Sequence, residues 1–176
     1  MKLPPNTISL RPASSQERGV FDNLVQLYCH DWSELVPLDV GLDGRFGGLA
    51  LEPYWSDDWR RPCLIQVAET LAGFALIEER SRLTGVRGVF DMAEFFVLRR
   101  YRRQGVGYAA AVAAFDRFKG PWEIRQRDEN PTATAFWRQV IADYTGGRYE
   151  ETRPISGWKG LVQTFSSAGA PSVRGP

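Results

Sequence analysis

The hydrophobic and polar positions of the chain repeat with two periods, and each period predicts one kind of secondary structure. Apolar residues spaced by three and four positions share one face of a helix, whereas alternating or continuous apolar runs are typical of strands. The first pattern predicts helices at 15–32, at 105–118 and from Asn130 to the Gly146-Gly147 pair. The second predicts strands at 7–10, 63–69, 71–79, 89–98, 122–127, 148–153 and 160–165.

The first helix carries the clearest pattern. Ser14 and Glu17 have the spacing of a capping box, in which each side chain satisfies a free amide of the first turn. One face then presents an apolar stripe, which we interpret as core: Phe21, Leu24, Val25, Tyr28 and Trp32. Residues 33–61 have no clear period, so they predict a long loop with one short helix near 53–59. A loop of this length in a compact domain is usually functional or mobile.

The predicted order is strand, helix, loop, three strands, helix, strand, helix and two strands. A chain of 176 residues has the length of one ordinary domain. We therefore expect one α+β domain at 1–166, with a mixed central sheet of about six to seven strands flanked by helices. The segment that follows, 167–176, predicts a flexible tail of Ser, Gly and Pro that begins near Ser166.

The formal net charge of +1 hides a segregation of charge along the sequence. Between Asp31 and Asp58 stand seven acids and one base, and between Arg80 and Arg103 stand seven bases and two acids. The near-zero sum argues against a protein that mainly coats nucleic acid. Each stretch is either solvated surface or a site for a ligand of opposite charge.

Several kinds of site and location are disfavoured by the sequence. It has no run of ~18 apolar residues that could cross a membrane, and residues 1–12 lack the apolar core of a secretory signal. Cys29 and Cys63 stand in apolar sequence, where reduced, buried thiols are expected. His30 is the single histidine, so zinc ligands are few and no metal is expected. We therefore expect a cytoplasmic protein.

One segment has the pattern of a ligand site. The predicted strand 89–98 leads into a turn with the motif Arg102-x-x-Gly105-x-Gly107, which opens directly into a helix. The first amides of a helix have no intrahelical acceptor, the helix dipole adds partial positive charge, and glycine allows close approach to the backbone. A pyrophosphate fits this turn and the four arginines around it, which are Arg99, Arg100, Arg102 and Arg103.

Three other interpretations of this segment compete. A dinucleotide-binding fold needs a third glycine, where this chain has Ala110, and a parallel βαβ repeat, which does not follow. The arginines at 99–103 could contact nucleic-acid phosphates, but the run is short and isolated. The segment could also be a surface turn without a ligand.

At these residues the sequence resembles the GNAT superfamily of N-acetyltransferases, and in particular small bacterial acetyltransferases. The family's acetyl-CoA signature, R/Q-x-x-G-x-G/A between the fourth strand and the third helix, is matched by Arg102, Gly105 and Gly107. The leading strand FFVLRRYR is similar to the family's approach to this motif. A later helix resembles the family's N-x-x-A-x-x-x-Y element through Asn130, Ala133, Phe136 and Trp137. The likeness covers roughly residues 7–165.

The resemblance implies that acetyl-CoA binds as the acyl donor. The turn and the first helical residues would hold the CoA pyrophosphate with their backbone amides and with two arginine side chains. The residues implied are Arg102, Arg103, Gln104, Gly105, Val106 and Gly107.

The resemblance also implies a path for the pantetheine arm. Val97 and Leu98 would lie beside it, where the strand separates from its neighbour. Asn130 would bond the pantetheine or simply cap its helix. Phe136 and Trp137 would line the CoA channel or belong to the core.

The reaction implied is transfer of acetyl from a thioester to a primary amine, which must lose a proton before it attacks. Glu94 is the candidate base, because a carboxylate in an otherwise apolar strand should have a raised pKa; the alternative is a glutamate that faces solvent. The family often places a tyrosine, as general acid, where this chain has Trp137. Either Tyr144, Tyr149, Tyr101 or water protonates the thiolate, or the chain binds CoA without turnover.

In this family the segment after the first helix commonly borders the acceptor site, and here that segment is the acidic stretch 31–58. Its carboxylates and the rings of Tyr54, Trp55 and Trp59 favour a cationic amine, such as a small amine or a basic peptide end. Expected partners are acetyl-CoA and this amine, without nucleic acid or a membrane, and a homodimer is compatible with the sequence. Two hypotheses follow: an acetyl-CoA-dependent N-acetyltransferase, or a non-catalytic module that binds acyl-CoA or docks a partner.

Overall fold

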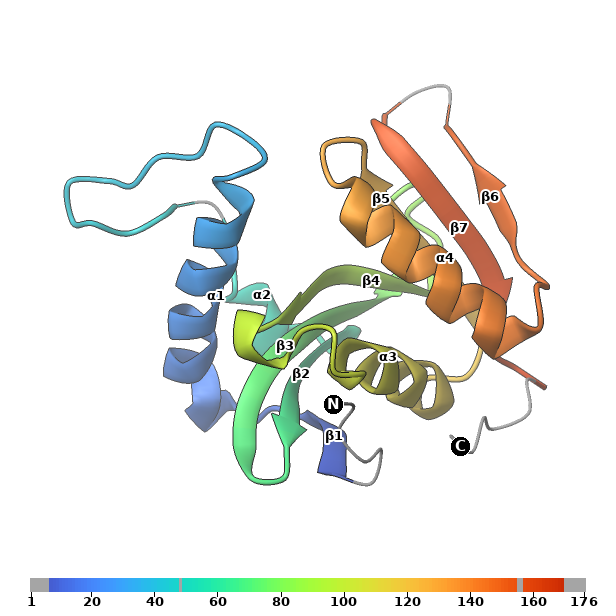
Figure 1. Ribbon diagram of the computed structural model, residues 1–176, viewed down its shortest axis with the longest axis horizontal. Helices are drawn as coiled ribbons and strands as arrows, with labels where there is room; N and C mark the ends of the chain where they lie inside the picture. Colours follow the sequence, from blue (N-terminus) through green and yellow to red (C-terminus); the bar gives the residue numbers. More distant parts are fainter. Residues whose placement is uncertain (1–6, 48, 155–156, 170–176) are drawn as a thin grey trace.

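Seven strands form one mixed sheet in the part of the chain that the computed structural model describes, residues 7–47, 49–154 and 157–169 (Figure 1). In their order across the sheet they are β1 (Ile8–Pro12), β2 (Arg60–Val67), β3 (Thr70–Arg80), β4 (Arg87–Val97), β5 (Pro121–Arg127), β7 (Gly160–Ser166) and β6 (Glu150–Thr152). The helices are α1 (Arg18–Trp32), α2 (Pro53–Ser56), α3 (Val106–Arg117) and α4 (Pro131–Thr145), with the 3₁₀ turns η2 (Ser15–Glu17) and η3 (Arg99–Tyr101). The predicted α+β fold with one mixed sheet is confirmed.

Each face of the sheet carries its own core, because successive side chains of a strand point to opposite faces. Ala75 and Ile77 of β3 pack in a cluster with α3 and α4. Their neighbours Phe74 and Leu76 pack in a second cluster with α1 and α2. Helices therefore cover both faces of the sheet (Figure 1).

Among the described strands, β4 and β5 form the one parallel pair, and they pair over a short distance. Their ladder consists of Phe90 with Trp122 and Asp91 with Glu123, whereas the ladder between β3 and β4 continues to Val97. Past Asp91 the two strands diverge. The peptide groups in the second half of β4 therefore lack a strand partner on the side of β5.

The ladder between β3 and β4 shifts register beside this divergence. Leu76 faces Glu94 and Ile77 faces Met92, so Ala93 has no partner across the ladder. A bulge of this kind re-aims the side chains that follow it. It places Glu94 beside Leu76, on the face that α1 covers.

The capping box predicted at the start of the first helix is confirmed. The amide of Ser14 donates to the Glu17 carboxylate at 2.9 Å, and the reciprocal bond is also present. The box opens the short turn η2, so the α-helix itself begins at Arg18 rather than at 15.

The segment after α1 forms an arm that projects away from the sheet (Figure 1). A bridge between Val40 and Phe46 closes the arm on itself, and residue 48 lies outside the described residues. The short helix predicted near 53–59 is α2.

The last strand continues further than the sequence predicted. Ser166 belongs to β7, and Ser167 is fully buried with its Oγ accepting from the Gly120 amide at 3.1 Å. These two residues are therefore not part of a flexible tail. The rest of that predicted tail, 170–176, lies outside the described residues.

The cysteines and the histidine, which were considered as disulfide partners and metal ligands, show no sign of either role among the described residues. Cys29 and Cys63 are buried free thiols, as predicted, and His30 is exposed. The described ranges contain no group of three or more His, Cys, Asp or Glu side chains placed to hold a metal ion. No helix in these ranges has the length and apolar character that a membrane crossing needs.

Candidate active site

A cleft of 1420 Å³ follows the second half of β4. One wall comes from the end of α1, with Tyr28, Asp31 and Trp32. The other walls come from the first turns of α3 and from the inner side of α4. The part of β4 that lines the cleft, 95–97, is the part that has parted from β5.

The first turn of α3 presents free amides at this cleft. Ala109 donates to the Gly105 carbonyl at 3.0 Å, so by helix geometry the three amides before it have no intrahelical acceptor. Gly105 precedes the helix with a φ of 87°, which an L side chain rarely adopts. A Cβ on Gly107 would lie 3.4 Å from the ring of Phe136, so glycine keeps the cleft open here. Free amides at a helix N-terminus are the kind of group that binds anions in proteins.

Two of the arginines in the loop before α3 are already engaged by the end of α1. Arg102 donates from Nε to the Val97 carbonyl at 2.7 Å and also pairs with Asp31. Arg99 pairs with Asp31 at 2.8 Å and with Glu34 at 3.4 Å. Their charge is therefore shared with carboxylates instead of standing free for a phosphate.

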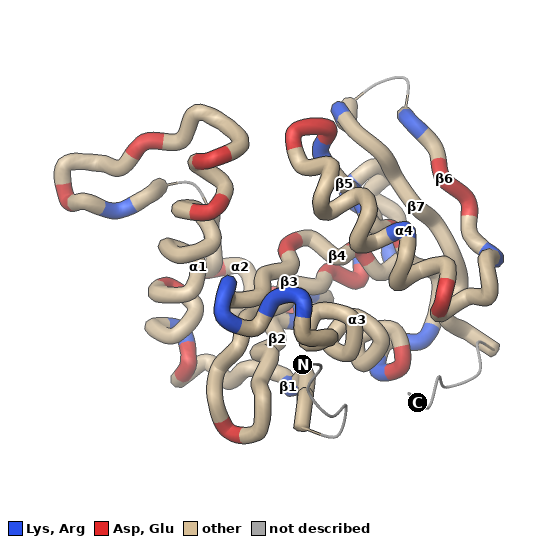
Figure 2. The backbone as a smooth tube through the Cα atoms, in the orientation of Figure 1, with Lys and Arg blue, Asp and Glu red and all other residues tan. Residues whose placement is uncertain are grey.

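Arg103 differs from these two arginines. It lines the cleft and is exposed, and no ion pair is found for it among the described residues. Figure 2 shows the basic run of this loop directly before α3. Arg103 is thus the arginine of the loop whose positive charge is most available to an anion in the cleft.

The cleft gathers most of the residues predicted for cofactor binding. Those that line it are Val97, Arg102, Arg103, Gln104, Gly105, Gly107, Asn130, Phe136 and Trp137. The side chain of Leu98 packs instead in the α1 cluster, and the side chain of Val106 is fully buried. Val106 can therefore face a ligand only through its backbone amide.

Residues of α4 have structural tasks in addition to their place in the cleft. The Oδ1 of Asn130 accepts from the Ala133 amide at 2.9 Å, which is the N-cap of α4. Phe136 stacks on Phe95 at a centroid distance of 5.9 Å, and Trp137 packs edge-on against Phe95 at 5.1 Å. Trp137 is 5% exposed and offers the cleft an apolar wall.

Glu94 is not simply a glutamate that faces solvent, because the Tyr28 hydroxyl donates a hydrogen bond to its Oε2. Burial raises the pKa of Glu94, while the bond from Tyr28 and the charges of Arg82 and Arg125 act in the opposite direction. The charge of Asp91 raises the pKa further. A raised pKa makes a carboxylate a better proton acceptor, and Tyr28 connects Glu94 to the cleft.

Tyr28 was missed by the sequence reasoning, which interpreted it as core. Phe21, Leu24 and Val25 of the same stripe are buried. Tyr28 packs against their cluster as well, but it is only partly buried and, with Trp32, also lines the cleft. Their position on the apolar stripe gave no signal of this.

The tyrosines proposed from the sequence as general acids lie elsewhere. Tyr144 is buried, and its hydroxyl contacts Asp116 at 2.9 Å and Lys119 at 3.0 Å. Tyr149 packs against the cluster under α3 and α4, and Tyr101 packs at the start of α3. Within the described residues, none of the three lines the cleft.

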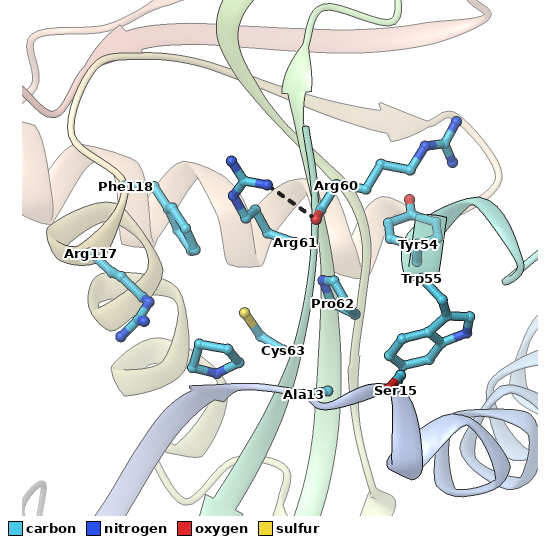
Figure 3. A pocket seen from close by; sticks show the side chains of 11 residues that line it. Ala13, Ser15, Tyr54, Trp55, Arg60, Arg61, Pro62, Cys63, Arg117 and Phe118 are labelled. Carbon is cyan, nitrogen blue, oxygen red and sulfur yellow. Dashed lines mark hydrogen bonds between the residues drawn. The ribbon is translucent and has the colours of Figure 1, made fainter. Parts of the chain in front are cut away.

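The expectation that the rings of Tyr54 and Trp55 border the acceptor site is wrong. They belong to a second cavity, of 390 Å³ (Figure 3). Tyr54 and Trp55 line this cavity and not the cleft, together with Arg61 and Arg117. The acidic residues of 31–58 do not all lie at the cleft. Asp57, for example, pairs with Arg60 at 3.1 Å. Asp31 and Glu34 are the acids of that stretch that reach the cleft.

Comparison with known protein families supports one assignment. A family model described as the acetyltransferase (GNAT) family matches residues 21–140, which run from α1 into α4. A comparison with curated protein sequences finds no match.

Solved structures share the fold at low sequence identity. A spermidine N-acetyltransferase from Vibrio cholerae, in complex with CoA and spermine, has a TM-score of 0.62 and 14% identity, covering 93% of this chain and 97% of that one. The ribosomal-protein-S18-alanine N-acetyltransferase from Escherichia coli has a TM-score of 0.60 and 12% identity, covering 93% and 96%. The yncA protein of Salmonella typhimurium, with its cofactor acetyl-CoA, has a TM-score of 0.62 and 12% identity, covering 92% and 95%. These likenesses establish the fold.

Proposed function

The chain belongs to the GNAT family of acetyltransferases, and from that premise we propose that it transfers an acetyl group from acetyl-CoA to a primary amine. The observation that carries this proposal is the free first turn of α3, with Gly105 and Gly107, which opens onto the cleft beside the part of β4 that has no strand partner on the side of β5. A pyrophosphate suits the former and the amides of a pantetheine suit the latter.

Residues of this chain then have distinct tasks. The amides at 103–107 and the side chain of Arg103 hold the phosphates, while Arg102 ties the loop to Val97 and to α1. Val97, Phe136 and Trp137 exclude water from the reacting groups. When bound, acetyl-CoA supplies the acetyl thioester, and Glu94 takes the proton that the amine must lose.

For the acceptor we propose an amine that enters as a cation. Support comes from Glu94 beside the cleft and from Asp31 and Glu34 in its wall. Two of the similar structures are named as acetyltransferases that act on amines, spermidine and an alanine of a ribosomal protein. Asp31 is paired with Arg99 and Arg102, and Glu34 with Arg99, so part of this negative charge is already balanced within the protein.

A release assay for free thiol tests the proposal. With acetyl-CoA and a panel of small amines and basic peptide ends, the wild type should release thiol on at least one amine. Glu94→Gln should lower the rate by about 10²–10⁴-fold, the usual contribution of a general base. Glu69→Gln removes one carboxylate from an exposed turn and should leave the rate unchanged.

The second hypothesis, a non-catalytic acyl-CoA-binding module, is favoured by one residue. Trp137 stands where the family often has its tyrosine acid, and an indole cannot protonate a thiolate. Tight CoA binding with no thiol release on the whole panel would establish this module and contradict the enzyme.

A further inference from the structure

The ring of Tyr28 lies between the cleft and Glu94. Tyr28 lines the cleft and donates its hydroxyl hydrogen to Glu94 Oε2, whereas Glu94 is not among the described residues that line the cleft. An amine that approaches from the cleft therefore meets the hydroxyl of Tyr28 before it meets the carboxylate.

The ring of Tyr28 is held in place by aromatic neighbours. It makes edge contacts with Phe74 and Phe96 at centroid distances of 5.7 Å, and with Trp32 at 6.1 Å. Contacts of this geometry stabilise a ring beyond its buried area. The hydroxyl therefore stays on Glu94 instead of swinging aside to admit the amine.

We propose that Tyr28 is a catalytic residue that passes the proton of the acceptor amine to Glu94. This inference rests on the proposed function and adds to it the group that touches the amine. The hydroxyl gives its hydrogen to Glu94 and accepts a side-chain hydrogen bond from Trp32. Its remaining lone pair can accept a hydrogen bond from an ammonium. One N–H bond of the ammonium breaks as its proton moves to Tyr28 Oη, and the original hydroxyl proton moves to Glu94 Oε2.

The remaining bonds balance without a further acid from the protein. The neutral amine attacks the thioester carbon, where a C–N bond forms and the C–S bond breaks. The nitrogen gives its second proton to the departing sulfur, and Glu94 later returns its proton to water. The reaction therefore proceeds with Trp137 at the position of the usual tyrosine.

The charges around the pair favour a relay over a phenolate base. Burial, and then the charge of Glu94, raise the pKa of Tyr28 far above its ordinary value. The other groups that act on Glu94 are Arg82, Arg125 and Asp91, and Cys29 on α1 also lies within range of its charge. Tyr28 thus remains a neutral hydroxyl at neutral pH and transmits a proton without losing one.

Tyr28→Phe tests the relay, because it keeps the ring among its neighbours and removes one oxygen atom. We expect kcat/KM for the amine to fall by about 10²-fold or more, with acetyl-CoA affinity close to the wild type and a lower Tm, because Glu94 loses a hydrogen-bond donor. Tyr144→Phe is the matched control: Tyr144 does not line the cleft, its hydroxyl contacts Asp116 in the last turn of α3, and the variant should keep the rate.

A proton inventory provides a second measurement that needs no variant. With a slow amine in mixtures of H₂O and D₂O, the wild-type rate should follow a curve that indicates two protons in one step. A straight line overturns the relay. So does a Tyr28→Phe rate close to wild type when Glu94→Gln is inactive, which leaves the proposed function standing. Absence of thiol release by the wild type on every amine contradicts the proposed function, and the relay with it.

Discussion

The two halves of β4 belong to one continuous strand but have opposite surroundings. In the first half, Asp91 pairs in register with Glu123 of β5 and accepts two bonds from Arg125, at 2.8 and 3.2 Å. We call this the closed half of β4, because it is paired with β5 and contributes to the core, and the second half the open half. In the second half, β5 has diverged, the bulge at Ala93 has changed the register, and the strand lines a cleft.

The difference shows how a strand can contribute backbone groups to a site where its neighbour in the sheet diverges. Pairing satisfies the peptide groups of the first half, so those groups can do nothing else. The second half has no strand partner on one side, where Arg102 takes the Val97 carbonyl, and stays fixed by β3 on the other. A rigid strand edge is therefore available beside the free first turn of α3.

We expect the largest effect, a loss of stability, when the ion pair between Asp91 and Arg125 in the closed half is broken. Asp91→Asn leaves the guanidinium of Arg125, whose side chain is 8% exposed, without its charge partner. Removal of one partner of such a pair costs about 3–5 kcal/mol of the free energy of unfolding, measured by urea denaturation. The double variant Asp91→Asn with Arg125→Gln should recover part of this loss, and a loss below about 1 kcal/mol in the single variant would show that the closed half does not depend on the pair.

We expect a smaller effect, a loss of CoA affinity, when a larger side chain fills the cleft beside the open half. Gly107→Val places methyl groups where even a Cβ would lie 3.4 Å from Phe136. Overpacking of this kind costs about 1–3 kcal/mol, so CoA affinity measured by calorimetry should fall by about 10-fold to 100-fold. Gly19→Ala, on the first turn of α1 with no atom near its Cβ position, should bind CoA as the wild type does.

The pH dependence of stability should show the cost of holding Glu94 in the open half. Because burial raises its pKa in the folded protein, folding retains a proton on Glu94 that the unfolded chain releases near its ordinary pKa of about 4.3. Stability from this group is present at low pH and is lost as the pH rises through the raised pKa. Glu94→Gln should therefore be more stable than the wild type at pH 7, and the two unfolding free energies should converge toward acid pH. A constant difference across pH would contradict the raised pKa.

The smallest effect separates the two arginines of the turn. Arg103→Ala should weaken CoA binding by about 2–5-fold at low salt, and less at high salt, because an exposed charge is screened. Arg102→Ala should act differently, since Arg102 is bonded to Val97 and Asp31. Its loss should loosen the turn and lower Tm as well as affinity. Equal salt dependence in the two variants would contradict this division.

The sequence predicted the elements and the glycine-containing turn before α3 well, because both depend on local signals. Helix and strand periods, the capping box at Ser14 and Glu17, and the glycines of the turn all act within a few residues. The N-cap of Asn130 is local in the same way, and it is confirmed.

The parts that the sequence did not predict depend on distant contacts. Tyr28 follows the same apolar spacing as Leu24, and only the position of α1 over the diverging strands brings it into the cleft. The pairing of Arg102 with Asp31 joins residues 71 positions apart, which no local pattern reveals. The side chain of Leu98 is turned into the α1 cluster for a similar reason.

We propose that the open half of β4 and the first turn of α3 bind the acyl donor. A titration of ¹⁵N-labelled protein with CoA, followed by amide chemical shifts, tests it most directly. The amides of Val97, Gly105 and Gly107 should shift on binding, while those of Phe90 and Asp91 in the closed half should not. Shifts confined to Arg61 and Cys63 beside the second cavity, or no shifts at all, would contradict the account.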